Sequence, residues 1–277
     1  MAGMLYLVPT PIGNLGDVSD RARQVLESVD FIAAEDTRVT LKLLNHLGIK
    51  KSLVSYYEHN KAFKGDQIVE RILAGETCAQ VSDAGSPAIS DPGEDLVKQC
   101  AAAGIRVCAI PGPCAAITAL SISGQSTGRF CFEGFLSTAK KSRREHLDSL
   151  KKEQRTMIFY EAPHKLAATL QDLLETFGPD RPISLCRELT KLHEEVIRTT
   201  LQGAVTYYQE NAPKGDFVLI VAGAPEEVVE SASPEDAAGR VAQLMEEGMS
   251  RKDAIRQTAQ ELGLPKNVVY EAALKAE

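Results

Sequence analysis

The segment at residues 81–93, VSDAGSPAISDPG, constrains the fold of this chain more than any other stretch. It follows an apolar run at 77–81 and precedes a stretch of helical composition at 94–103. Glycine permits positive φ and close backbone approach, whereas proline fixes φ and removes a hydrogen-bond donor. We therefore expect a stiff, bent loop at the carboxyl end of a strand, which is where open α/β sheets bind their ligands.

The charge of this loop narrows the class of ligand. It carries Asp83 and a second aspartate but no lysine or arginine. Loops that cradle phosphate groups normally add a cation to their backbone N–H groups. The composition instead favours a ligand with an amine, hydroxyl groups or a positive charge. The alternative is an ordinary strand-to-helix connection in which glycine and proline serve only as turn residues.

Two further loops repeat the pattern of apolar strand, stiff cation-free loop and helix. The strand at 5–8 enters PTPIGNLG, and the strand at 106–110 enters PGPCAA. Alternating strands and helices predict a parallel α/β sheet to about residue 124, so all three loops should meet at one edge and form one pocket. The first loop lacks G-x-G-x-x-G, which argues against dinucleotide binding. Cys114 is predicted at a helix N-terminus, where packing is favoured over nucleophilic chemistry because no partner base is evident.

Charged residues bunch at the ends of two other predicted strands. The strand at 31–34 ends in EDTR, and the strand at 53–57 ends in EHNK. Glu35 and Arg38 are candidate site residues, although a helix cap with a local ion pair explains them equally well. Histidine titrates near neutral pH, so His59 is a further candidate, with a solvated loop histidine as the alternative.

A second α/β domain is predicted beyond a linker at 124–128. Several of its strands end in charged clusters, such as EAPHK at 161–165 and RELTKLHEE at 187–195. Such strand ends, facing the loops of the first domain across a cleft, are a common kind of ligand site. The strand candidates lie at 156–160, 183–186, 196–200 and 216–222.

A basic stretch follows residue 135 in an otherwise acidic chain, whose formal net charge is −7. Its densest part is Lys140, Lys141, Arg143 and Arg144. A run of this kind is usually a solvated helix face. Because a polyanionic substrate would need a local basic patch, these residues are also the best candidates for contacts to the phosphate groups of a nucleic acid.

The tail of the chain is predicted to be helical. A polar stretch at 226–235 is typical of a linker, and Ser250 is the expected N-cap of the second of the helices that follow. The helix-turn-helix spacing comes from predicted helices at 237–247, 251–262 and 267–276. Because acidic residues slightly outnumber basic ones, we favour a packing or partner-binding module over a DNA reader. The predicted organisation is a domain at 1–124, a domain at 125–228 and a helical module at 233–277.

Composition excludes several classes of protein. The 277 residues exceed one typical domain, and an apolar content of 44% suffices for ordinary cores. The six cysteines are scattered without a C-x-x-C pair, which is typical of reduced thiols in a cytosolic enzyme. No metal site is expected, because the five histidines are dispersed and form no H-E-x-x-H. We expect neither a signal peptide nor a bilayer-spanning segment.

Seven stretches, taken together and in order, resemble a known family. They are VPTPIGNLGD, AEDTR, SDAGSPAISDPG, IPGP, FYEAPHK, RELTKLHEE and KGDFVLIVAG. Along essentially its whole length the chain is similar to the ribosomal RNA small subunit methyltransferases of the tetrapyrrole methylase-like superfamily, whose members use S-adenosylmethionine. One departure is Cys114, where superfamily members often carry serine after the corresponding Pro-Gly-x, although a small side chain is kept.

This resemblance implies two α/β domains of the tetrapyrrole methylase type with S-adenosyl-L-methionine in the interdomain cleft, plus a helix-turn-helix-like module. It implies 2′-O-methylation of a decoding-centre cytidine in small-subunit (16S) rRNA by a cytoplasmic homodimer. Matching motif positions place around the cofactor Pro9, Asp83, Gly85, Pro111, Gly112, Cys114, Ala115, Tyr160, Leu189 and Phe217. The candidates for proton handling are Glu188 and Lys191, followed by Glu35, Arg38 and His59.

Two other functions stay open on the sequence. A small-molecule methyltransferase acting on a tetrapyrrole-like ring would need a large apolar cleft, and neither a basic patch nor a helical tail. A ligand-sensing regulator would bind nucleic acid through the tail, and the acidic balance of the tail argues against it.

Overall fold

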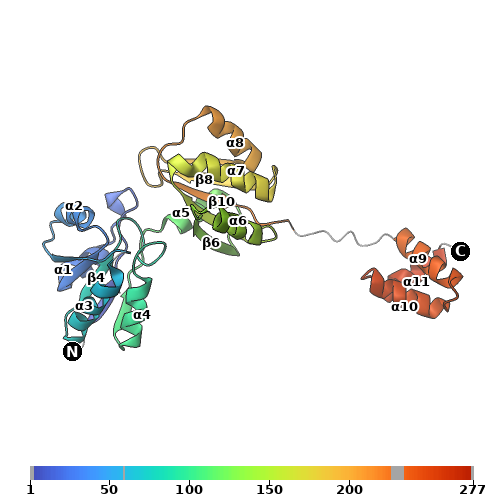
Figure 1. Cartoon of the computed structure of the whole chain (residues 1–277), viewed down its shortest axis with the longest axis horizontal. Helices are drawn as coiled ribbons and strands as arrows, with labels where there is room; N and C mark the ends of the chain where they lie inside the picture. The colour runs from blue at the N-terminus through green and yellow to red at the C-terminus, as the bar shows by residue number, and fades with distance from the viewer. Residues whose placement is uncertain (1–2, 59, 226–233, 276–277) are drawn as a thin grey trace. The chain divides into compact units, whose positions relative to one another are not determined.

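The structure, a computed structural model, describes residues 3–58, 60–225 and 234–275. Its contacts divide the chain into two compact units, Met1–Ala224 and Pro225–Glu277 (Figure 1). The larger unit contains two five-stranded sheets with their helices, and the smaller one is helical. Within the described ranges, no helix has the length and apolar character needed to cross a membrane.

The first sheet is entirely parallel, with strand order β3-β2-β4-β1-β5. Each strand lies within two residues of its predicted position, so the predicted parallel α/β sheet is confirmed. The parallel order places the carboxyl ends of all these strands at one edge. The strands are β1 (Met4–Leu7), β2 (Phe31–Ala34), β3 (Ser52–Ser55), β4 (Cys78–Val81) and β5 (Arg106–Ala109).

Helices cover both faces of this sheet. On β2, Ile32 and Ala34 face one helical layer, whereas Phe31 and Ala33 face the other. A strand buried on both faces must be apolar throughout, which explains the run FIAA. The first layer comprises α1 (Asp20–Ser28) and α2 (Thr37–Leu47), and the second comprises α3 (Lys61–Leu73) and α4 (Glu94–Ala102).

The second sheet is mixed, with strand order β6-β7-β10-β8-β9. The pair β6 and β7 is parallel, and the other neighbouring pairs are antiparallel. The parallel pair requires a crossover, which α6 (Lys140–Ser149) provides. The strands are β6 (Phe130–Phe135), β7 (Thr156–Glu161), β8 (Pro182–Arg187), β9 (Glu195–Thr200) and β10 (Phe217–Val221).

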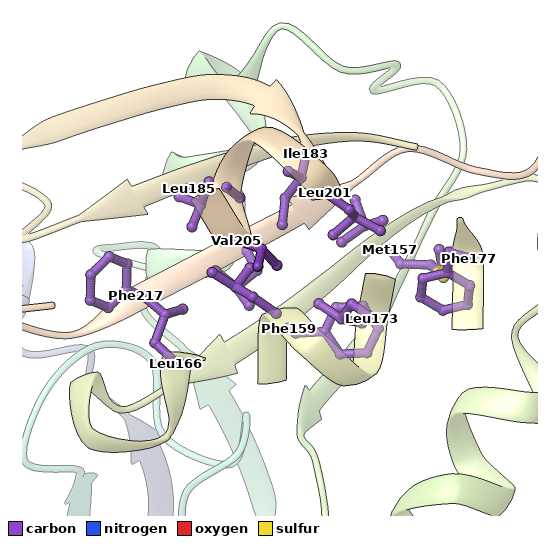
Figure 2. Close-up of a cluster of buried hydrophobic side chains, with 14 of the residues drawn as sticks. Met157, Phe159, Leu166, Leu173, Phe177, Ile183, Leu185, Leu201, Val205 and Phe217 are labelled. Carbon is purple, nitrogen blue, oxygen red and sulfur yellow. The ribbon is translucent and has the colours of Figure 1, made fainter. Parts of the chain in front are cut away.

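Figure 2 shows the main apolar core of the second sheet. Phe159 and Leu185 from the strands pack against Leu173 of α7 (Leu166–Phe177) and Leu201 of α8 (Leu201–Glu210), and all four side chains are buried. Helices α7 and α8 therefore share one buried core with the strands of this sheet.

Helix α5 (Ala115–Ser123) covers the opposite face of the second sheet. Its Ala119 and Leu120 pack with Ile158 and Ile220 from two strands of that sheet. The chain thus leaves the first sheet at the end of β5 and packs its next helix on the second sheet. The domain boundary proposed at residue 124 falls after α5, although the packing of α5 is with the second sheet.

The smaller unit consists of α9 (Pro234–Glu246), α10 (Arg251–Glu261) and α11 (Lys266–Lys275). The three predicted tail helices are therefore present. Ser250 caps α10 as predicted, because its side chain accepts a hydrogen bond from the Asp253 N–H. These helices share their own apolar core, which includes Val241, Ile255 and Val269. Most of the predicted linker, at 226–233, lies outside the described residues.

Candidate active site

The stiff loops of the first sheet are tied together at its carboxyl edge. Thr10 and Gly85 exchange two backbone hydrogen bonds, of 2.9 and 3.0 Å. Gly112 lies so close to Pro9 that a Cβ atom at residue 112 would come within 2.9 Å of the Pro9 Cβ. Glycine is needed there because the Pro9 ring lies against the Gly112 backbone. The prediction that the three loops meet at one edge is confirmed.

Carboxyl groups gather beside these loops. The Asp36 N–H donates to Asp83 Oδ1 at 3.0 Å, and the Asp83 N–H donates to Glu35 Oε2 at 3.3 Å. Burial raises the pKa of both Glu35 and Asp83 above their ordinary values. Burial, reinforced by the nearby charge of Glu35, raises the pKa of Asp91 to about 6. This concentration of negative charge favours a cationic ligand.

Arg38 is engaged by its neighbour Asp36. Their side chains form an ion pair at 2.6 Å, and the Arg38 side chain is 86% exposed. Asp36 also caps α2 by accepting a hydrogen bond from the Arg38 N–H at 2.8 Å. These hydrogen bonds lower the pKa of Asp36 to about 2. The observed arrangement is the helix cap with a local ion pair that the sequence allowed as an alternative.

A cavity of about 300 Å³ lies where the loops meet the second sheet. This volume is at the lower end of the range for small-molecule sites. Its walls are mostly apolar, with a few charged groups at defined positions. Loop residues Ile12, Gly85 and Asp91 line one side, and Tyr160, Leu189 and Phe217 line the other.

Tyr160 is held in this wall by α5. Its hydroxyl oxygen accepts a hydrogen bond from the Ala116 N–H at 3.1 Å. Its ring packs edge-on against Phe132 and Phe135, with centroids 5.1 and 5.5 Å away. Burial raises the pKa of Tyr160 to about 12, so the phenol stays neutral at physiological pH. Tyr160 therefore shapes the cavity and carries no charge into it.

The loop after β8 brings an ion pair to the cavity. Lys191 Nζ lies 2.7 Å from Glu188 Oε1, and this hydrogen-bonded contact lowers the pKa of Glu188. Glu188 and Thr190 have φ values of +51° and +65°, which residues other than glycine rarely adopt. Gly215 packs against the Glu188 side chain, so a Cβ at residue 215 would overlap its carboxylate. Strained backbone of this kind concentrates at functional sites.

The cavity gathers many of the predicted residues. Lys191 and Glu188 both line it, so the pocket is not cation-free as the loops alone suggested. Glu35 and Arg38 do not line it, and His59 lies outside the described residues. The predicted cofactor residues that line it are Gly85, Cys114, Ala115, Tyr160, Leu189 and Phe217. Those that do not are Pro9, Asp83, Pro111 and Gly112.

The lining residues that had not been predicted include Asp91, Phe135 and Asp216. Asp91 belongs to the central loop, but the sequence does not tell which of the two loop aspartates enters the cavity. Asp83 lines a neighbouring groove instead. Phe135 and Asp216 gave no signal beyond their place at strand ends. Among the described residues, no three His, Cys, Asp or Glu side chains are grouped to hold a metal ion.

A second, basic groove lies between α6 and the start of α7 and encloses about 640 Å³. Lys140 and Arg144 line it from α6, and His164 and Lys165 line it from the segment before α7. Lys141 is 89% exposed on the same helix. Asp148, Asp172 and Glu175 also line the groove, so its basic side chains, which lie mainly on α6 and before α7, are the part that could attract a polyanion.

Arg143 differs from its neighbours on α6. Its side chain is only 15% exposed, and Nε lies 2.5 Å from a carboxylate oxygen of Asp172. Its guanidinium also donates to Thr169 Oγ1 at 2.8 Å. Arg143 therefore ties α6 to α7, and its hydrogen-bonding capacity is used within the protein.

Comparison with known proteins agrees with this architecture. The family model Tetrapyrrole (Corrin/Porphyrin) Methylases matches residues 4–205, and the model RsmI C-terminal HTH domain matches 231–277. The methyltransferase CobJ superposes with a TM-score of 0.61 at 18% identity, covering 80% of this chain and 95% of that chain. A uroporphyrin-III C-methyltransferase from Thermus thermophilus, solved with S-adenyl homocysteine, gives 0.56 at 15% identity, covering 79% and 97%. The fold is that of the tetrapyrrole methylases.

Closer relatives define the branch of this class. A protein of Synechocystis sp. is 50% identical over 99% of both chains, and one of Halalkalibacterium halodurans is 50% identical over 97% of this chain and 93% of its own. A third, from Escherichia coli O157:H7, is 44% identical over 99% and 96%. Each is named ribosomal RNA small subunit methyltransferase I. The chain belongs to this family.

The raised pKa of Asp91 predicts a pH-dependent effect of Asp91→Asn. The folded-state pKa of about 6 lies above the ordinary value of 3.8, so the folded state holds the extra proton between these values. This contribution to the free energy of unfolding therefore falls as pH rises from about 4 to about 6. The substitution should raise Tm at about pH 8 and have little effect at about pH 4.

Thermal melts of the two proteins at both pH values measure this difference. Asp17→Asn, which changes an exposed carboxylate, is the matched control. An equal change in Tm at the two pH values would contradict the assignment.

Proposed function

We propose that this chain is an S-adenosyl-L-methionine-dependent methyltransferase that methylates the ribose 2′-hydroxyl of a decoding-centre cytidine in 16S rRNA. The observation that carries the proposal is the cavity at the loop edge, which is lined by carboxylates. It occurs in a chain that is 50% identical, over 99% of its length, to a protein named for small-subunit rRNA methylation. The identity of the nucleotide as a cytidine, and of the acceptor atom as the ribose 2′-oxygen, is inferred from the motif resemblance.

The residues of the cavity fit this cofactor. Its amine and sulfonium are cationic, and the cavity offers carboxylates from Asp91 and Glu188. Ile12, Leu189 and Phe217 supply apolar surface for an adenine ring. When bound, the cofactor supplies an electrophilic methyl group attached to a positively charged sulfur. We propose that Pro9, Pro111 and Gly112 act indirectly, by holding the loops, and that the Asp83 side chain acts by ordering the backbone at Asp36.

The ribose hydroxyl must lose its proton as its oxygen gains the methyl group, and a carboxylate within reach would accept that proton. Asp91 suits this role, because its pKa of about 6 lies near physiological pH. Lys191 lowers the pKa of Glu188, so Glu188 is ionised at neutral pH and is the weaker base. We assign proton acceptance to Asp91 and positioning to the Glu188–Lys191 pair.

Incubating the chain with hypomethylated small ribosomal subunits and tritiated S-adenosylmethionine should yield 2′-O-methylcytidine, identified by nucleoside mass spectrometry. Asp91→Asn should lower the single-turnover rate by about 100-fold or more and abolish its rise through about pH 6. Glu188→Gln should cause a smaller loss.

Glu210→Gln, at an exposed position on α8, should keep the parent rate. An unchanged rate in Asp91→Asn would remove its assigned role. If cofactor binds but neither subunits nor bare rRNA are labelled, the acceptor is a small molecule and the rRNA function is wrong.

We propose that Lys140, Lys141 and Arg144 on α6, with His164 and Lys165, contact phosphate groups of the rRNA. The support is their exposure and the basic groove that four of them line. Each lost phosphate contact should reduce the slope of log K against log salt by about one.

The double variant Lys140→Gln with Arg144→Gln should therefore reduce the salt slope for binding to subunits by about two. Lys50→Gln with Lys98→Gln removes two exposed charges elsewhere and should leave the slope unchanged. Equal slopes for all three proteins would identify α6 as a solvated face.

A homodimer acting in the cytoplasm, where the ribosomal substrate is found, completes the proposal. Support for an interface comes from large apolar side chains on the surface of the described residues, including Leu192 at 93% and Phe63 at 66% exposure. Sedimentation equilibrium should give twice the chain mass of 30.0 kDa, and a single-chain mass at micromolar concentration would contradict the dimer.

A further inference from the structure

The small helical unit carries a basic groove that the functions proposed above do not use. The groove lies between α10 and α11 and encloses about 550 Å³. Its polar and aromatic lining comprises Arg251, Lys252, Arg256, Lys266, Asn267 and Tyr270.

The groove concentrates positive charge in a segment that is slightly acidic as a whole. Residues 234–275 contain six Lys and Arg and seven Asp and Glu, yet four of the six cations line the groove and none of these carboxylates does. Two cations of the unit form ion pairs, since Arg240 lies 2.8 Å from Glu261 outside the groove and Arg256 lies 3.1 Å from Asp253 at its edge. The premise that the tail lacks a basic face, which was drawn from its charge balance, is therefore wrong.

The positions of these cations do not favour the helices that carry them. Arg251 and Lys252 are the first two residues of α10, and Lys266 is the first residue of α11. The N-terminal end of a helix carries partial positive charge, so cations there cost stability rather than add to it. An anion in the groove would offset both the side-chain charges and the two helix ends.

The remaining lining residues suit a nucleic acid. Lys252, Arg256 and Lys266 are exposed, and Tyr270 is 50% exposed. An exposed ring beside Lys and Arg can stack on a base while the cations contact phosphates. Asn267 adds an amide that can donate and accept hydrogen bonds. An acidic peptide would use the cations but not the ring.

We propose that this groove binds the phosphodiester backbone of the ribosomal RNA substrate, as a second RNA contact on a separate compact unit. The identity of the RNA rests on the proposed function, whereas the charge complementarity rests on the groove itself. Two RNA contacts on one chain raise the effective concentration of each for the other. Loss of the groove should therefore weaken substrate binding and leave the chemical step at saturating substrate unchanged.

The test is the salt dependence of binding to hypomethylated small ribosomal subunits, measured with the full chain and without cofactor. Lys252→Gln with Lys266→Gln should reduce the salt slope by about two, and Lys266→Gln alone by about one. Lys275→Gln, at the other end of α11 and outside the groove, is the matched control and should leave the slope unchanged.

Tyr270 tests the stacking contact separately. Tyr270→Ala should weaken binding by about fivefold or more, whereas Tyr270→Phe should bind as the parent does, because stacking needs only the ring. Equal affinities for all three proteins would overturn the stacking role.

Binding and methylation are measured apart, so the two hypotheses can fail separately. An unchanged salt slope in the double variant overturns the groove and leaves the methyltransferase intact. A reduced slope in a chain that methylates no rRNA supports the groove and overturns the chemistry. Tighter binding of the parent to duplex DNA than to subunits, lost in the double variant, would reassign the groove to DNA and overturn the RNA proposal.

Discussion

The packing of α5 on the second sheet is the constraint on which the site depends. By chain order α5 continues the strand–helix series of the first sheet, yet its apolar residues pack with Ile158, Cys186 and Ile220. The contact is reinforced at its far end, where the Ser123 carbonyl accepts hydrogen bonds from Ser184 Oγ at 2.8 Å and Arg198 Nε at 3.0 Å. Because α5 begins at the cavity and is buried against the second sheet, it brings the loops of the first sheet to the strand ends of the second.

This arrangement explains the electrostatics of the cavity. A carboxyl group that is half buried cannot be fully solvated, so the neutral form gains at Asp91 in the cavity, as it does at Glu35 beside the loops. Where a cation is in contact the effect is reversed, as in the Glu188–Lys191 pair. One cavity therefore holds a carboxyl group poised to exchange a proton near neutral pH and another that stays ionised, set apart by their surroundings.

The distribution of charge on the surface is the property that the sequence predicted least well. A run of basic residues on α6 is visible in the sequence, but Arg143 is drawn inward by Asp172, which lies 29 positions away in the chain. The tail has a slightly acidic composition, but most of its cations line one groove in the folded unit. Arg240 lies outside this groove and pairs with Glu261. Net charge is a sum over residues, whereas a binding face depends on which residues share a surface.

The sequence by itself determined the parallel first sheet, the three tail helices and the meeting of the stiff loops, because apolar runs, caps and the Gly and Pro positions act over short stretches of chain. It also placed part of the cavity lining, including Gly85, Glu188, Lys191 and Phe217. Only the tertiary structure decided that Asp91 rather than Asp83 enters the cavity, that Glu35 and Arg38 stay outside it, and that α5 belongs to the packing of the second sheet. Each of these depends on contacts between segments far apart in the chain, whose geometry no local pattern specifies.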